Sequence, residues 1–267
     1  TFNNNVAGGG GGSAKEFFMN QAAIAEIVVS TTAMSAEQAY GGVGINAIPK
    51  DGGNEFSYYV NITGTNGDFQ SDNIGPDLQE RGANPLAKNI KIWDYGVGIG
   101  GPIVKDRVWF YSAHRWWGSQ NYQAVTTVNL TPHTPVYTED PSNPTWTDFY
   151  NQDNNIRFTV QASDRHKVTL SQNFQNNCAC HFWTHYGITS QNASTDYRYN
   201  PVNLTQTTWT FPVNNRLLFE AGGSFLRNMS APRPQAEVLP TDIAHIQFVP
   251  FRNWNANAFN TCDPCLY

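Results

Sequence analysis

Four cysteines are the residues of this chain whose spacing points most directly to chemistry. They form two tight pairs, Cys178 with Cys180 and Cys262 with Cys265, and His181 follows the first pair. Zinc sites use C-x₂-C pairs, so one interpretation is a metal site built from the four sulfurs with His181 or His185. The other is disulfide bonding, for which four cysteines allow three connectivities. A C-x-C pair is less usual for zinc, and this favours disulfides.

A run of aromatic residues is the second candidate for a binding function. Trp116, Trp117 and Tyr122 follow closely on the aromatic segment 109–111. One interpretation is a platform that stacks on a sugar or an aromatic ligand. The other is the aromatic girdle that β-barrels place at the two surfaces of a membrane. We expect the girdle role for residues 109–111, and both roles stay open for Trp116 and Trp117.

No combination of residues in the sequence indicates an enzyme. The six histidines stand without a nucleophile and a carboxylate at a telling spacing, and no G-x-S-x-G, phosphate-binding loop or H-E-x-x-H motif is present. With 16 Lys and Arg and a net charge of −5, the chain also lacks the basic patches that bind nucleic acid. We therefore predict no catalytic residues, no cofactor, no metal and no nucleic-acid partner.

After Asn54 the sequence alternates between apolar and polar residues, as half-buried β-strands do. Phe56, Tyr58, Val60 and Ile62 share one face of the first such strand. In all, seven strands are predicted, near residues 56–63, 90–100, 107–118, 156–161, 167–174, 204–213 and 216–225. Short turns are predicted at 101–106, 163–165 and 214–215. Long loops are predicted at 67–89, 121–153, 178–202 and from 228 onward.

The alternation of short turns with long loops decides the predicted fold class. In an up-and-down antiparallel sheet it puts every short turn at one end and every long loop at the other, which is typical of an outer-membrane β-barrel. A β-sandwich, the competing fold, does not usually show this asymmetry. No stretch approaches the roughly 18 apolar residues of a transmembrane helix. The prediction is an all-β chain that forms part of a transmembrane antiparallel β-barrel of about seven strands.

Two segments carry a resemblance to a known family. Residues 41–56 read GGVGINAIPKDGGNEF, after the segment 23–30, which reads AIAEIVVS. Residues 98–110 read GIGGPIVKDRVWF. In this order, the segments resemble the end of the plug domain and the first barrel strands of TonB-dependent outer-membrane receptors. The branch with a carboxypeptidase-regulatory-like N-terminal extension is the closest, and the resemblance runs from about residue 14 to residue 230.

The resemblance implies how the chain is divided. Residues 1–53 would be the C-terminal part of the plug domain, and residues 54–267 the first strands and extracellular loops of the barrel. A family barrel has about 22 strands, and at about 10 residues each these need about 220 residues before any loop. We therefore expect an incomplete barrel, finished by further residues or other chains. Gly96, Gly98 and Gly100 would face the plug, unless they only mark a bend.

The resemblance also implies a function. The protein would be an active-transport receptor of the outer membrane, contacting lipid and the rest of its barrel. A scarce nutrient would bind at the extracellular loops and plug and enter with energy relayed by the TonB complex, which contacts a segment upstream of residue 1. The substrate stays open among siderophores, oligosaccharides, peptides and cobalamin-like compounds. The cysteines would then face the cell exterior, where disulfides persist.

Two alternative functions stay open at this point. One is a structural or adhesive surface β-protein without transport. The other is a secreted carbohydrate-binding β-sandwich, which would bury residues 56, 58, 60 and 62 between two sheets. A receptor would instead pack residues 20–50 against one face of a curved sheet and point residues 56, 58, 60 and 62 away from them.

Overall fold

The computed structural model of the chain is built mainly from β-strands. It describes residues 18–30, 44–134, 136–182, 184, 190–236, 238–239 and 241–242. A two-stranded sheet comprises β1 (Ile24–Ser30) and β2 (Gly44–Pro49). The helical segments with described bounds are short: η1 (Gln21–Ala23), η2 (Gly67–Phe69), α1 (Pro76–Glu80) and η4 (Gln191–Ala193). The prediction of an all-β chain is confirmed.

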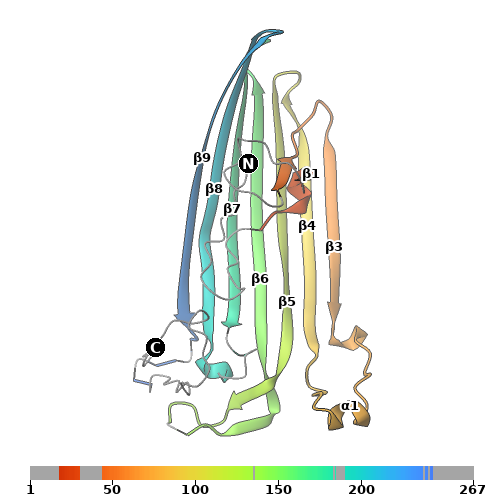
Figure 1. Ribbon diagram of the computed structural model, residues 1–267, viewed down its shortest axis with the longest axis vertical. Helices are drawn as coiled ribbons and strands as arrows, with labels where there is room; N and C mark the ends of the chain where they lie inside the picture. The colour runs from red at the N-terminus through yellow and green to blue at the C-terminus, as the bar shows by residue number, and fades with distance from the viewer. Residues whose placement is uncertain are drawn as a thin grey trace.

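Seven further strands form one antiparallel sheet in which each strand pairs with the next in sequence (Figure 1). The strands are β3 (Ser57–Asn66), β4 (Asn89–Val104), β5 (Val108–Asn129), β6 (Glu139–Gln161), β7 (Lys167–Phe182), β8 (Thr195–Asn214) and β9 (Leu217–Pro234). The predicted number of strands is therefore correct. Within the described residues the sheet is open, with β3 and β9 as its two edges.

The connections alternate in length as predicted. Short turns follow β4, β6 and β8 at one end of the sheet, and the longer connections lie at the other end (Figure 1). The turn after β4 is closed by a hydrogen bond from Arg107 N to Val104 O (3.1 Å), and the turn after β6 by one from His166 N to Ser163 O (3.2 Å). After β8, the Asn214 side chain accepts a hydrogen bond from Arg216 N (2.9 Å).

The strands are much longer than the sequence pattern indicated, and two predicted loops are wrong. Most of 121–153 belongs to β5 and β6, and both ends of 178–202 belong to β7 and β8. These stretches lack apolar alternation because their amide and hydroxyl side chains pair with one another across strands. Gln123 Nε2, for example, donates to Thr147 Oγ1 at 3.1 Å. Backbone pairing thus continues where the hydrophobic pattern stops.

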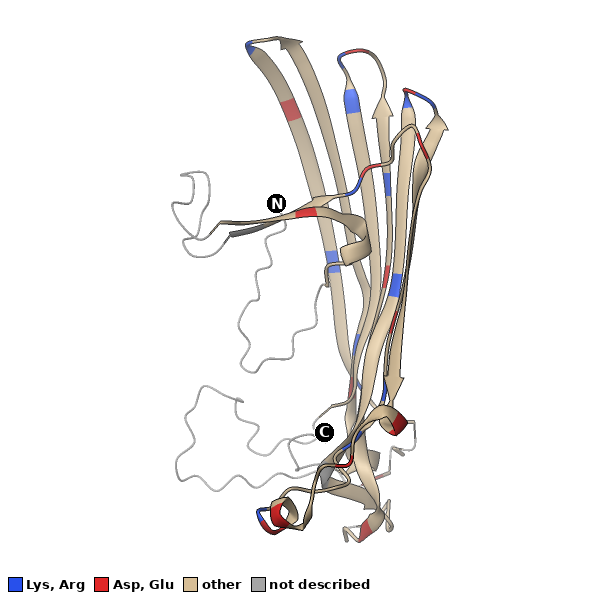
Figure 2. Cartoon of the chain, turned by 90° about the vertical axis from the view of Figure 1, so that its right-hand side faces the viewer, with Lys and Arg blue, Asp and Glu red and all other residues tan. Residues whose placement is uncertain are grey.

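The two faces of the large sheet differ in what covers them. The β1–β2 hairpin projects from one face, which we call the hairpin face (Figure 2). Directly paired residues in antiparallel strands share a face, so the register assigns side chains to each side. Asp153 pairs with Gln175, and Thr159 with Thr169; all four are buried and polar and lie on the hairpin face. The buried side of this sheet is therefore largely polar.

The other side, which we call the opposite face, is apolar and exposed along β3 and β4. Tyr58, Val60 and Ile62 are 73%, 67% and 77% exposed. They pair in order with Ile99, Val97 and Tyr95, which are also exposed. A soluble sheet places such side chains in its core. Here the polarity of the two faces is reversed.

Candidate functional site

Residues 18–30 and 44–54, which we call the N-terminal segment, pack against the hairpin face. Several side-chain hydrogen bonds join this segment to residues far away in the sequence. Asn20 Nδ2 donates to Asp153 Oδ1 at 2.8 Å. Tyr111 donates from its hydroxyl to the carbonyl oxygen of Ala22 at 2.8 Å. Gln175 bonds both backbone groups of Phe18, accepting from its N–H at 3.0 Å and donating to its carbonyl. Three neighbouring strands thus hold a single short segment.

Asp153 is at the centre of this contact, and its side chain is almost completely buried. Besides the amide of Asn20, its carboxylate accepts hydrogen bonds from Asn173 and, at 2.8 Å, from Gln175. A carboxylate only accepts hydrogen bonds, and each of these three neighbours turns a donor toward it. The site is therefore a matched set of one acceptor group and three amide donors.

A second set of polar contacts anchors the end of the N-terminal segment. Asp51 pairs with Arg157 and accepts a hydrogen bond from Thr159 Oγ1 at 2.9 Å. Asn54 holds the turn between β4 and β5, because its side-chain oxygen accepts from Asp106 N (3.0 Å) and from Trp109 Nε1 (2.7 Å). Polar groups thus fasten both ends of the segment to the sheet.

Two glycines of β4 make room for the contact at Tyr111. A methyl group on Gly98 would lie 2.9 Å from the Tyr111 hydroxyl, and one on Gly100 would overlap the ring itself. Tyr111 cannot easily move, because it is buried and bonded to Ala22. The expectation that Gly96, Gly98 and Gly100 face the N-terminal segment agrees with this geometry for Gly98 and Gly100, with Tyr111 as the intervening side chain. A methyl group on Gly96 would instead meet Tyr59, Asn61 and Arg115.

The predicted aromatic residues are separated by the strand. Trp116 and Trp117 are neighbours in β5, so their side chains point to opposite faces. Trp117 lies on the hairpin face, edge-on to Phe18 at 6.0 Å, with the Arg115 guanidinium 4.5 Å from its ring centre. Trp116 lies on the opposite face, 5.9 Å from Trp93. Tyr122 lies farther along β5 and is exposed, so the three predicted residues form no common platform.

The first cysteine pair lies in a strand and not in a loop, contrary to the prediction. Cys178 and Cys180 belong to β7, are buried, and are joined by a disulfide with their Cα atoms 5.3 Å apart. Cys262 and Cys265 lie outside the described residues. The Asp196 carboxylate lies within 4.8 Å of both sulfurs, but sulfurs bonded to each other offer no thiolate to a metal. The bond agrees with the disulfide interpretation for this pair.

A contact at the long-loop end of the sheet joins the connection after β5 to the residues after β9. His133, after β5, is 2.6 Å from the Asp242 carboxylate, measured from Nδ1 to Oδ1. The backbone N–H of Leu239 donates to the same carboxylate at 2.7 Å. These two hydrogen bonds, with the Leu239 amide as the larger cause, lower the pKa of Asp242 below its ordinary value.

Sequence reasoning missed the site around Asp153. Asp153 stands among asparagines and glutamines in a stretch predicted to be a loop, and its partner Asn20 is far away in the sequence. The available signal was the density of amide residues on both β6 and β7, since amides that recur at every second position of adjacent strands can pair with each other.

Comparison of the sequence with models of protein families, with curated proteins and with solved structures finds no match in any of the three. Among the described residues, no helix has the length and apolar character needed to cross a membrane.

Proposed function

We propose that this chain is part of a TonB-dependent outer-membrane receptor that imports a scarce nutrient. Residues 1–53 act as the C-terminal part of its plug, and β3–β9 as part of its barrel wall. The long connections after β3, β5 and β7 face the cell exterior, and the short turns face the periplasm. Nutrient binds at the exterior end, and release of the plug segment opens the way inward.

The reversed polarity of the large sheet carries this proposal. Lipid solvates apolar side chains, and the interior of a membrane barrel is polar. Val60 and Val97, exposed on the opposite face, suit the lipid side, whereas Asp153 and Gln175, buried on the hairpin face, suit the interior. The docked N-terminal segment lies on the polar side, where a plug must lie.

The opposite face also carries polar residues across β5–β8, and these are paired with one another. His114 bonds Ser112 (2.9 Å, from Nε2) and Asn154 (2.8 Å, from Nδ1). Gln172 bonds Asn203 and accepts from Thr205 Oγ1 at 2.6 Å. Pairing lowers the cost of placing polar groups against lipid. The uninterrupted apolar surface is therefore the one on β3 and β4.

The chemistry of the docked segment suits a part that must be released. Its links to the sheet are mostly hydrogen bonds, as between Asn20 and Asp153, and ion pairs, as between Asp51 and Arg157. Hydrogen bonds to charged groups, as these are, contribute about 1.5–3 kcal/mol each, and on release both partners can bond water instead. An apolar interface of the same area would instead expose that area to water on release, which is unfavourable.

The sandwich alternative fits the observations less well. A sandwich would bury Tyr58, Val60 and Ile62 under a second sheet, yet the described residues place none over them, and all three are mostly exposed. A structural or adhesive surface protein shares the membrane placement but has no need for a releasable interior segment. Transport measurements separate it from a receptor.

The test combines substrate binding with a lock on the N-terminal segment. The intact protein is screened against ferric siderophores, oligosaccharides, peptides and cobalamin, and uptake of the bound compound is measured in cells. Asn20 and Asp153 are then both replaced by cysteine and joined with a short thiol-specific crosslinker. Because the segment can no longer leave the sheet, crosslinking should abolish uptake while binding persists.

The control places the same crosslink within the wall. Thr169 and Thr208 are directly paired on β7 and β8, so joining cysteines at these positions restrains no segment that must move. Uptake should survive in this variant. Equal uptake with and without the crosslink between positions 20 and 153 would refute release of the segment, and absence of the protein from the outer membrane would refute the receptor itself.

A further inference from the structure

We propose that the long-loop end of β3 and β4 carries a binding site for the phosphate-bearing headgroup of an anionic lipid. The inference rests on the proposed membrane placement and adds a ligand to the surface that faces lipid. It concerns a pocket at the β3 edge of the sheet, whose aromatic residues on β4 and β5 and whose Lys91 lie on the opposite face, away from the N-terminal segment.

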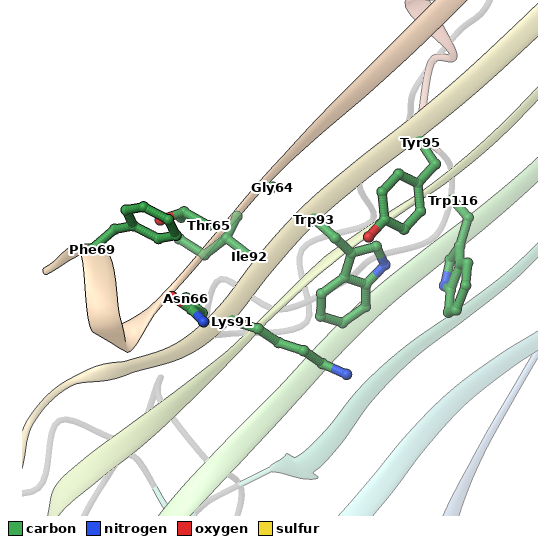
Figure 3. A pocket seen from close by; sticks show the side chains of 9 residues that line it. All are labelled: Gly64, Thr65, Asn66, Phe69, Lys91, Ile92, Trp93, Tyr95 and Trp116. Atoms are coloured by element: carbon green, nitrogen blue, oxygen red, sulfur yellow. The ribbon is translucent and has the colours of Figure 1, made fainter.

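The pocket has a volume of about 430 Å³ and is lined mainly by aromatic and polar side chains (Figure 3). Trp93 and Trp116 lie with their ring centres 5.9 Å apart, and Tyr95 lies 6.1 Å from Trp116. Phe69, largely exposed, lies on the other side (Figure 3). Aromatic rings of this kind suit the boundary between hydrocarbon and water, since they have an apolar body and a polar tip.

The polar tips in the pocket are hydrogen-bond donors. Figure 3 shows the indole nitrogens of Trp93 and Trp116 turned toward each other, with the Tyr95 hydroxyl beside them. The Trp93 side chain is more than nine-tenths buried, and its Nε1–H has no hydrogen-bond partner among the described residues. An indole N–H can only donate. The ligand that satisfies it must therefore bring an acceptor.

A positive charge accompanies these donors. Lys91 extends alongside Trp93, with its Nζ 4.9 Å from the centre of that ring (Figure 3). In the part of the chain that the structure describes, Lys91 forms no ion pair; the charge of Asp148 reaches it only at longer range. An ammonium group beside hydrogen-bond donors favours an anion with several acceptor oxygens, and a phosphate group is such an anion.

The height of the pocket fits a headgroup. From Trp93 to Val104, at the short-turn end, β4 covers about 36 Å at about 3.3 Å per residue. Barrel strands tilt by about 35–45°, so this length corresponds to a height of about 25–30 Å, close to the apolar band of a membrane barrel. Val97 and Ile99 lie within that height, and Lys91 lies two residues beyond Trp93, just past its long-loop end. The pocket therefore lies where a lipid phosphate would be.

The experiment measures lipid preference in vesicles. The intact protein is reconstituted in phosphatidylcholine, and the association of spin-labelled phosphatidylglycerol is compared with that of spin-labelled phosphatidylcholine. Lys91→Gln should lower the preference for the anionic lipid about fivefold, the effect of one lysine near a charged headgroup. Trp93→Phe keeps the ring but removes the donor, and should lower it as well. Lys88→Gln is the control, because Lys88 is exposed and pairs with Asp72.

Brominated acyl chains in the same vesicles report insertion independently, because they quench tryptophans that lie against lipid. The inference is supported if the tryptophans are quenched and if the preference for phosphatidylglycerol falls in Lys91→Gln and Trp93→Phe but not in Lys88→Gln. Quenching with an unchanged preference in Lys91→Gln would overturn the lipid site and leave the receptor proposal intact. Without quenching, the membrane placement fails, and the lipid site fails with it. If soluble glycerol phosphate displaced the spin-labelled phosphatidylglycerol as well as a lipid does, the pocket would bind phosphate but not specifically a lipid. That result would also overturn the lipid site.

Discussion

The side-chain amide of Asn20 bonds the buried carboxylate of Asp153 across 133 residues of sequence. Asn20 is fully engaged, because its side-chain oxygen also accepts the backbone N–H of Ala22 at 3.0 Å. This single residue therefore starts η1 and attaches it to β6. Folding of the N-terminal segment and its docking on the sheet are coupled through one side chain.

Replacing Asp153 by asparagine should loosen the N-terminal segment. The NH₂ group of the new asparagine would face the NH₂ group of Asn20, Asn173 or Gln175, so two hydrogen-bond donors would meet. The Asn20 amide cannot turn over to present its oxygen instead without losing its bond to Ala22 N. An unsatisfied buried polar group costs about 1–3 kcal/mol. Hydrogen exchange of the amides of residues 18–23 should therefore speed up. Asp164→Asn, at an exposed carboxylate in the turn after β6, serves as the control, and unchanged exchange in the Asp153 variant would contradict the assigned role.

Gly100→Ala should destabilise the sheet where Tyr111 packs. The added methyl overlaps the ring of a buried tyrosine that is bonded to Ala22, and overpacking of this kind costs about 1–3 kcal/mol. Gly223→Ala is the matched control, since nothing lies within 4 Å of its added methyl. Urea unfolding should separate the two variants. Combining Gly100→Ala with Tyr111→Leu should recover part of the loss, and full additivity of the two changes would argue against the clash.

Val60→Arg should impair membrane insertion. Val60 is exposed on the opposite face at about mid-height of the apolar band, where an arginine costs about 2–4 kcal/mol in a membrane barrel. Thr63→Arg, on the hairpin face of the same strand, should insert normally. Folding into vesicles, followed by the gel mobility of unheated samples, measures the difference. A Val60→Arg variant that is more soluble and equally well folded in water would point to a soluble protein.

The four cysteines should form two local disulfides. Cys178 and Cys180 are bonded to each other, so Cys262 and Cys265 have only one another as partners within the chain. Mass spectrometry of non-reduced peptides should therefore show two separate peptides, each gaining about 2 Da on reduction, as expected for one intra-peptide bond. A single species that joins the two regions would show that the pairing is different.

Acid should release the contact between Asp242 and His133. The pKa of Asp242 is lowered in the folded protein, so its carboxylate stabilises the fold above its unfolded-state pKa, and this contribution is lost as the pH falls through the lowered value. Exchange of the Leu239 amide should speed up over that acidic range, after correction for the intrinsic rate. Asp242→Asn should remove the extra dependence on pH, and an identical profile in both proteins would refute the linkage.

The sequence predicted the elements near the short turns well and the long-loop end poorly. The strand expected near 90–100 lies within β4, Asn89–Val104, and the strand expected near 216–225 lies within β9, Leu217–Pro234. Alternation is clear in β3 and β4, because apolar side chains such as Val60 and Val97 gather on one face of these strands. Farther along β5 and β6 both faces carry amides and hydroxyls, so the pairing of Asn121 with Thr147 leaves no hydrophobic period to detect.

The contacts that define the candidate site were beyond sequence reasoning for a different reason. Which amide faces which carboxylate depends on the register of β6 against β7, and a shift of one residue would turn Asp153 to the other face. Nor does any local pattern connect Asn20 to that register. The partners become visible only when three strands and the N-terminal segment are placed together.

If the sheet spans a membrane as we propose, the length of its strands has a consequence for how solutes would approach it. β6 spans residues 139–161, about 75 Å at about 3.3 Å per residue, whereas the hydrocarbon layer is about 30 Å thick. Even when tilted, the sheet would rise far above the bilayer surface. A diffusing molecule would then meet a hydrogen-bonded, hydrophilic rim well before it reached the lipid plane, and capture would begin on that rim.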